Sequence, residues 1–534
     1  MAAAALGACS AHSVRPACPQ GERCLFAGNG AEPATLDPAL ATGAPEIRII
    51  DDMMEGLVAN DAAGRPIPGI ASSWDVSPDH LTWTFHLRPA RWSDGSPVTA
   101  DDFVLGVQRA LDPKVASPYG ALLYAIRNAK AVSEGAAPPA ALGVTAPDAR
   151  TVRIALAHPA PYLLQLARQP LMMPAPRQAV ARWGQAWTQP GHYLSDGPYV
   201  LQAWTSADHV VVVKNRDYYA AAQACLDRVV YYPTEDYLSA ERRVRRGELD
   251  MQEGIKANRV AFLRRPGQIP AYVHVAPYLG TEYLAFNRRA QPALADRRVR
   301  QALAMAIDKA FITGKLLGGV WTPADSFVPP GTADYPGQAA PPWASWPLAQ
   351  RQAQARRLLA QAGYGPARPL RLSLLVRSTV DTTMVAPAIQ ADWNAIGVDL
   401  AITPAEGAVA YAQARAGAFE VFDAAWLADY DDAADFLYRM RSDAGPMNYP
   451  AYADAAFDAW LDKADAEPDP ARRGQDMAQA ERGLLQDAAI APIWYTAAEN
   501  LVSPRVSGWV DNLLDVHPAR FLCVSPTQSA PGGR

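Results

Sequence analysis

The chain has 534 residues, which is too long for one hydrophobic core and predicts two or three domains. A net charge of −5 without a basic block argues against a nucleic-acid partner, and no stretch reaches the ~20 apolar residues of a membrane span. Fourteen Trp and 21 Tyr supply large apolar surfaces for packing and for gripping small ligands.

The N-terminus carries a short apolar run that ends in Leu6-Gly7-Ala8-Cys9. This tetrapeptide resembles the lipobox of bacterial lipoproteins, in which the cysteine is lipidated after cleavage. We interpret residues 1–24 as the remnant of an export signal with Cys9 as the candidate lipidation site; a disordered Ala-rich tail is the alternative. The other cysteines show no metal-ligand spacing, and disulfides or buried free thiols are both open for them: Cys18, Cys24, Cys225 and Cys523.

Hydrophobic periodicity predicts strands that alternate with helices, as in α/β domains. Residues 46–58 have helical spacing, whereas residues 81–87 alternate strictly, as a half-buried strand does. Thr99, followed by Asp101 and Asp102, predicts a helix N-cap. We also expect strands at 24–27, 152–156, 197–201, 210–213, 249–251, 273–275, 370–376, 398–402, 419–426 and 493–495, and helices at 161–166, 238–246, 296–317, 348–362, 385–396, 453–465 and 470–487.

Catalytic and metal-binding motifs are absent from the sequence. It lacks G-x-S-x-G and H-E-x-x-H, and its eight His include no pair at i, i+4. The acidic run from Asp429 to Asp435 lacks the Gly and the Glu of a calcium loop. We therefore expect that the protein is not an enzyme and that it has no cofactor and no metal site.

One acidic stretch, Trp426 to Leu437, follows a predicted buried strand. Asp429, three residues after Trp426, suits the capture of a cationic group, because the indole supplies apolar contact and the carboxylate supplies charge. Taken alone, these residues favour the alternative, in which Asp429 caps the following segment or is simply solvated.

Three stretches together resemble the extracytoplasmic solute-binding proteins of peptide ABC importers, the oligopeptide-binding family (family 5). They are Trp83 to Phe103, Asp112 to Tyr119 and Trp426 to Leu437, and weaker similarities extend from about residue 24 to about residue 523. The resemblance implies an α/β fold: a two-lobed periplasmic clamp with mixed β-sheets and an additional third domain. One lobe would combine 25–54, 178–279 and 497–534, the extra domain would be 55–177, and the second lobe 280–496.

The resemblance also implies a function. A short peptide would lie extended between two closing lobes, paired as if a strand were added to a sheet, and would be delivered to the permease subunits of an ABC importer. The protein would be a periplasmic monomer without catalysis, touching the membrane only through an N-terminal lipid. A non-peptide solute in the same fold (a cationic amine, a sugar derivative or a metal complex) and chaperone-like binding of unfolded chains are the alternatives.

The family's ligand contacts fall mainly on the acidic stretch. Asp429 stands where the family binds the peptide's N-terminal ammonium. Trp426 matches a pocket tryptophan, with packing against the lobe core as its alternative, and Ala425 and Leu427 would offer backbone groups. Tyr119 resembles a pocket tyrosine of the extra domain, with a core position as the alternative.

The resemblance suggests further contacts at two other places. Thr42-Gly43-Ala44 lies where relatives supply backbone pairing, although a glycine in a turn needs no ligand. Arg415 aligns with an arginine that helps to meet a peptide carboxylate; a solvated arginine at a helix end is the alternative.

Two acidic residues depart from the family pattern. Asp423 replaces an arginine three residues before the pocket tryptophan, and Glu253 stands where relatives have neutral polar residues. We therefore expect a cavity that prefers cationic peptides or ligands without a free carboxylate.

Overall fold

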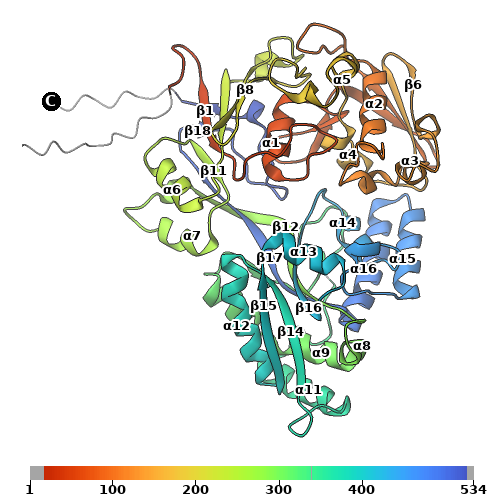
Figure 1. Cartoon of the computed structure of the whole chain (residues 1–534), viewed down its shortest axis with the longest axis vertical. Helices are drawn as coiled ribbons and strands as arrows, with labels where there is room; N and C mark the ends of the chain where they lie inside the picture. Colours follow the sequence, from red (N-terminus) through yellow and green to blue (C-terminus); the bar gives the residue numbers. More distant parts are fainter. Residues whose placement is uncertain (1–16, 338, 526–534) are drawn as a thin grey trace, which may run out of the picture.

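The computed structural model describes residues 17–337 and 339–525, which form two lobes that share one mixed β-sheet, with an extra domain beside them (Figure 1). This arrangement confirms the α/β class. The path of the shared sheet is β15 (Val398–Ala405), β14 (Leu370–Arg377), β16 (Val421–Leu427), β12 (Val273–Phe286), β17 (Ile490–Val502), β11 (Met251–Glu253), β1 (Cys24–Gly28), β10 (Arg228–Tyr232), β9 (His209–Lys214) and β8 (Tyr199–Thr205), with β13 (Thr322–Pro323) beside β17.

The first lobe contains the strands from β11 to β8 and three helices, α1 (Ala44–Met53), α6 (Tyr237–Arg245) and α7 (Ala257–Leu263). Its first strand, β1, lies between β10 and β11 and is parallel to both. Disulfides join Cys18 to Cys24 and Cys225 to Cys523, so the four cysteines left open by the sequence are bonded rather than free. The second bond holds the C-terminal segment, with β18 (Val506–Ser507) and β19 (Cys523–Val524), against this lobe.

The second lobe is built on parallel strands with helical crossovers. β14 pairs in parallel with both β15 and β16, so α12 (Val380–Asn394) and α13 (Gly407–Arg415) connect parallel strands, as helices do in βαβ units. The remaining helices of this lobe are α8 (Pro292–Ala295), α9 (Arg297–Ala306), α10 (Lys309–Phe311), α11 (Leu348–Gln361), α14 (Ala434–Leu437), α15 (Ala455–Ala466) and α16 (Pro470–Asp487).

The continuous helix expected over 296–317 is wrong. It ends with α9, and α10 and a π-helical turn at Ile312–Leu316 follow. The break falls at Asp308, whose side chain accepts a hydrogen bond from the Phe311 amide at 3.0 Å while its own amide donates to Asp392 at 2.8 Å. The cap at Asp308, together with the hydrogen bond to the distant Asp392, therefore outweighs the apolar periodicity.

The extra domain contains a four-stranded antiparallel sheet. Its strand order is β4 (Ala71–Val76), β5 (Thr82–Leu87), β7 (Thr151–Ala155), β6 (Val144–Asp148). Alternate β5 residues are buried, as the sequence predicts, and the predicted cap at Thr99 is a capping box with Asp102 at the start of α2 (Ala100–Ala110). The domain also holds β2 (Val58–Asn60), β3 (Pro66–Pro68), α3 (Ala129–Ser133) and α4 (Leu163–Leu166), and α5 (Arg177–Trp183) follows it.

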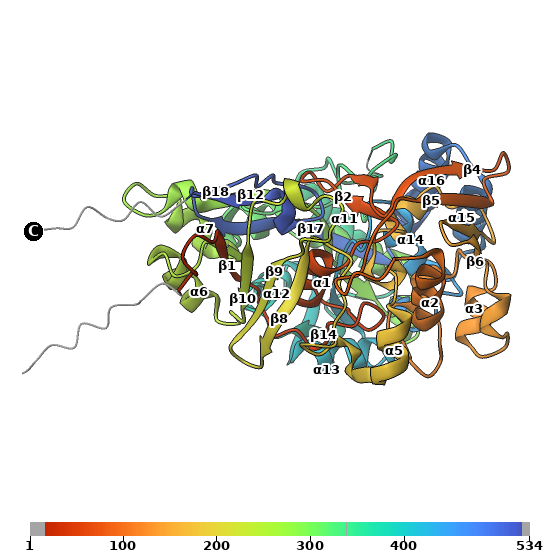
Figure 2. The ribbon, with the colours of Figure 1, turned by 90° about the horizontal axis from the view of Figure 1, so that it is seen from above.

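Two long strands link the lobes. β12 pairs with β16 over Gly280–Phe286 and with β17 along most of its length, and β17 also pairs with β11. The register of β12 against β17 shifts between Pro277 and Thr281. Seen from above, α6 and the extra domain lie at opposite ends of the molecule, with α1 between them (Figure 2).

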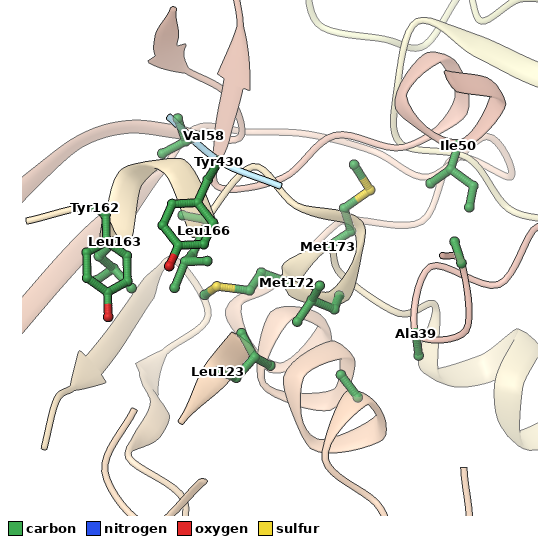
Figure 3. Close-up of a cluster of buried hydrophobic side chains, with 14 of the residues drawn as sticks. Ala39, Ile50, Val58, Leu123, Tyr162, Leu163, Leu166, Met172, Met173 and Tyr430 are labelled. Atoms are coloured by element: carbon green, nitrogen blue, oxygen red, sulfur yellow. The ribbon is translucent and has the colours of Figure 1, made fainter. Parts of the chain in front are cut away.

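The extra domain also touches the second lobe through an apolar cluster (Figure 3). Tyr162 stacks on Tyr430 with ring centroids 5.2 Å apart and an interplanar angle of 17°. Arg473 lies over the Tyr162 ring and pairs with Asp432 at 2.6 Å. Because Tyr430 directly follows Asp429, this cluster fixes the loop that carries the Asp429 carboxylate, the candidate partner of a ligand ammonium.

Candidate ligand-binding site

A cavity of about 420 Å³ lies between the lobes, within the range of small-ligand sites of about 300–1,000 Å³. All parts of the fold contribute to its wall. The first lobe supplies α1 and the residues before it, the extra domain supplies Tyr119 and 168–170, and the second lobe supplies Arg377, Tyr411 and 425–429. The C-terminal segment 514–518 completes the wall.

The structure brings many of the predicted site residues together on this wall. Their roles as ligand contacts stay a prediction. These residues are Thr42, Ala44, Tyr119, Ala425, Trp426, Leu427 and Asp429.

The loop after β16 holds Asp429 through a second carboxylate. Asp435 accepts hydrogen bonds from the Asp429 main-chain amide at 2.8 Å and from the Trp426 indole at 2.9 Å. Burial and the neighbouring Asp429 raise the pKa of Asp435 well above its usual range. The indole and the Asp429 backbone are thereby fixed together.

Asp429 itself presents a buried acceptor. Its Oδ2 atom is buried and accepts no hydrogen bond from the described residues. Burial raises the pKa of Asp429 to about 6, against the opposing fields of Arg439 and Arg168. A buried carboxylate oxygen on a cavity wall suits an N–H donor of positive charge, because the charge and the missing hydrogen bond are then compensated together.

Aromatic and apolar side chains flank this carboxylate. Arg439 stacks over the Trp426 ring. Tyr119 donates its hydroxyl to the Thr42 carbonyl at 3.4 Å, and burial raises its pKa to about 12, so it remains a neutral phenol. Leu427 is 43% exposed, which leaves an apolar surface for a ligand.

Asp423 and Glu253 are not on the cavity wall, and the premise of the expected cationic preference therefore fails. Glu253 forms an ion pair with Arg48. Asp423 pairs with Arg377 at 3.3 Å, and Arg377 also pairs with Glu282. In both places a buried carboxylate stands behind an arginine that lines the cavity.

Two other predicted residues also lie off the wall. Arg415 is exposed at the end of α13, one helical turn beyond Tyr411, which does line the cavity. Gly43 is the N-cap of α1, and a Cβ added there would come within 2.5 Å of the Glu46 carboxylate. A larger residue at this position would therefore require the Glu46 side chain to move.

Sequence reasoning missed Asp51, Arg168, Arg377 and the segment 514–518. The sequence does contain a feature that could have indicated Arg168, since a cation is unexpected within the apolar stretch from 160 to 175. No comparable sequence feature indicates the segment 514–518. In the structure His517 stacks on Trp509 with centroids 3.5 Å apart, and its Nε2 lies 2.9 Å from Asp515.

Within residues 17–337 and 339–525, no group of three or more His, Cys, Asp or Glu side chains is arranged to hold a metal ion. No helix in this part of the chain has the length and apolar character needed to cross a membrane.

Two lobes around a shared sheet, with a mixed-charge cavity between them, define a solute-binding protein of the periplasmic clamp type. The family model "Bacterial extracellular solute-binding proteins, family 5 Middle" matches residues 65–448, and the chain belongs to this family. The family and the clamp with a third domain, both predicted from the sequence, are thus confirmed.

Known relatives match along nearly the whole chain. The chain is 37% identical over 498 residues to the periplasmic murein peptide-binding protein MppA of Escherichia coli K12, covering 92% of this chain and 91% of the relative. It is 36% identical over 489 residues to the periplasmic oligopeptide-binding protein OppA of the same organism, covering 91% and 89%.

Solved structures agree with these matches. The E. coli murein tripeptide binding protein MppA superposes with a TM-score of 0.83 at 36% identity, covering 94% of this chain and 99% of that one. Haemophilus influenzae OppA, solved in complex with the peptide RPPGFSPFR, gives a TM-score of 0.81 at 32% identity, covering 94% and 99%. The chain is a periplasmic protein, like these relatives. Cys9, the candidate lipidation site, lies outside the described residues.

Proposed function

We propose that this protein binds short peptides, without catalysis, in an extended conformation between its lobes and delivers them to an ABC importer in the inner membrane. The observation that carries the proposal is the buried, unpartnered Oδ2 of Asp429 on the cavity wall. Relatives named for binding peptides, one of them solved with a peptide, support it.

The N-terminal ammonium of the peptide donates to Asp429, which replaces water as its partner when the lobes close. Next to it, β16 offers backbone groups. β16 pairs with β12 over 421–427 but with β14 only at Val421 and Phe422. Beyond Phe422, no described strand pairs with the edge of β16 that faces β14. Ala425 and Leu427 lie on this stretch, and an extended peptide can add there as a strand.

We further propose the domain boundaries expected from the sequence: 25–54 with 178–279 and 497–534, then 55–177, then 280–496. The lobes move about the middle of β12 and β17, where the register shifts. The protein acts as a monomer that hands its cargo to permease subunits.

Isothermal titration calorimetry with Ala-Ala-Ala tests the assignment of Asp429. Asp429→Asn keeps the shape of the side chain and removes its charge, so the buried ammonium loses its partner at a cost of about 3–5 kcal/mol, at least roughly a hundredfold in Kd. Asp399→Asn, whose side chain is 70% exposed on β15, is the matched control and retains wild-type affinity. Unchanged affinity in Asp429→Asn would sink the ammonium assignment.

Native mass spectrometry of protein taken from its own cell envelope tests the ligand class. A ladder of short peptides supports the proposal. A single non-peptide mass would replace it with the alternative of a dedicated carrier for an amine, a sugar derivative or a metal complex. Chaperone-like binding predicts instead that unfolded chains compete with short peptides at equal strength.

A further inference from the structure

Three arginines line the ligand cavity, and they differ in their partners. Arg48 pairs with Glu253, and Arg377 pairs with Glu282 and Asp423. Arg168 forms no ion pair with any residue that the structure describes. Among the described residues its guanidinium makes one hydrogen bond, from Nε to the side-chain oxygen of neutral Gln165, at 3.2 Å.

Arg168 is nevertheless buried, with 8% of its surface exposed. Asp51, Asp429 and Asp431 lie near enough to act on it through their fields, but none is within ion-pair distance. Asp51 is a weak counter-charge at neutral pH, because burial raises its pKa to about 7. A buried guanidinium without a carboxylate partner is costly, and an anion that enters the cavity removes that cost.

The position of Arg168 is fixed next to the ammonium site. The following residue, Gln169, donates its side-chain amide to the main-chain carbonyl of Asp429, and both Arg168 and Asp429 line the cavity. A ligand whose ammonium meets Asp429 therefore places its first residues beside Arg168.

We propose that Arg168 binds a carboxylate of the ligand within one or two residues of the ammonium, so that the protein selects peptides carrying a negative charge at that end. This inference rests on the proposed peptide-binding function. The guanidinium can hold a carboxylate through two parallel N–H donors, as arginine does elsewhere. The carboxylate comes from one of two sources: an acidic side chain at the first or second residue, or the C-terminus of a dipeptide.

Calorimetry with matched peptides tests the inference and separates the two sources. Glu-Ala-Ala is compared with Gln-Ala-Ala, and Ala-Glu-Ala with Ala-Gln-Ala, for the side-chain source. Ala-Ala is compared with its C-terminal amide for the dipeptide source. The wild-type protein is expected to prefer the charged member of at least one pair by roughly tenfold or more.

Variants at Arg168 then assign the preference. Arg168→Gln is expected to reduce the ratio of affinities for the charged and the neutral member of each pair to about one. Arg168→Lys is expected to retain a reduced preference for the charged peptides, since it keeps the positive charge but loses the two parallel N–H donors of the guanidinium. Arg371→Gln makes the same substitution at a side chain that is 79% exposed, and keeps the wild-type ratio.

The outcomes separate the inference from the function on which it rests. Equal binding of all charged and neutral pairs by the wild-type protein overturns the role of Arg168 and leaves peptide binding intact. A preference that survives in Arg168→Gln, with the variant folded by its thermal melt, also overturns it. Failure of every peptide to bind the wild-type protein overturns both.

Discussion

Gln169 of the extra domain donates its side-chain amide to the main-chain carbonyl of Asp429, a residue 260 positions further along the chain. This hydrogen bond joins the extra domain to the loop of the second lobe. Asp435 holds the same residue from the other side, through the Asp429 amide. The Asp429 carboxylate is therefore positioned by contacts to the backbone of its own residue. Its Oδ2 atom stays without a partner among the described residues.

Removing the Gln169 amide is expected to weaken peptide binding. Gln169→Ala leaves the Asp429 carbonyl without this donor and loosens the loop, which costs about 1 kcal/mol, or roughly fivefold in Kd for Ala-Ala-Ala by calorimetry. Gln108→Ala removes an exposed contact to the Pro139 carbonyl and serves as the control, with wild-type affinity. Equal affinities in the two variants would show that the bond does not position Asp429.

The Arg377 cluster predicts effects of very different size on stability for its members. Arg377→Gln leaves the buried carboxylates of Glu282 and Asp423 without their shared cation, and is expected to lower the free energy of unfolding by about 3–5 kcal/mol. Asp423→Asn keeps the pair between Arg377 and Glu282 and is expected to change it by less than about 1 kcal/mol. Urea denaturation followed by circular dichroism measures both. A loss in Asp423→Asn as large as in Arg377→Gln contradicts this account of the cluster.

Peptide affinity is expected to fall in acid. The pKa of Asp429 is raised to about 6 by burial, with Arg439 and Arg168 opposing, and Asp435 and Tyr119 also face it. Ammonium binding requires the ionised form, so below pH 6 a proton must leave first, and affinity drops by up to tenfold per pH unit. Titrations of Ala-Ala-Ala between pH 4.5 and 7.5 check this slope, which Asp429→Asn should abolish. A flat wild-type profile would contradict the assignment.

Glu499 predicts a separate pH dependence, that of stability. Burial raises its pKa from an ordinary value of 4.5 to about 8, although the Trp321 indole donates to it. The folded state therefore holds more protons between these values, and the free energy of unfolding falls as pH rises through this window, by at most about 1.4 kcal/mol per unit.

Glu499→Gln mimics the protonated side chain and removes this dependence. It is expected to match the wild type near pH 4.5 and to be more stable at pH 8.5, measured by urea denaturation at both values. Glu134→Gln, at an exposed position, is the control and follows the wild type throughout. Equal stability of Glu499→Gln and wild type at pH 8.5 would refute the prediction.

Local signals were sufficient for many elements of the fold. The alternation of β5 and the capping box at Thr99 depend on neighbouring residues and were predicted correctly. β12 and β17 were predicted only in fragments, near 273–275 and 493–495, because their 14 and 13 residues are set by pairing with distant strands. The break at Asp308 depends on Asp392, which is also remote in sequence.

The candidate site likewise contains residues that local sequence indicates and residues that only the tertiary fold brings together. Residues near Trp426 were found through their resemblance to a family motif, whereas Arg168 and the segment 514–518 reach the same cavity wall as Asp429 only through tertiary folding. Charge was the least predictable property. Asp423 and Glu253 suggested an acidic cavity, but the arginines that pair with them come from β14 and α1.

The covalent bond between Cys225 and Cys523 has a consequence for the order in which the protein is assembled. A chain emerging from its N-terminus presents the strand β1 first, but the neighbouring β11 pairs with β17, near the other end. The sheet of the extra domain and the parallel strands β14 to β16 arise from shorter stretches of chain and can form during emergence. The lobe that begins folding first is therefore the last to be finished.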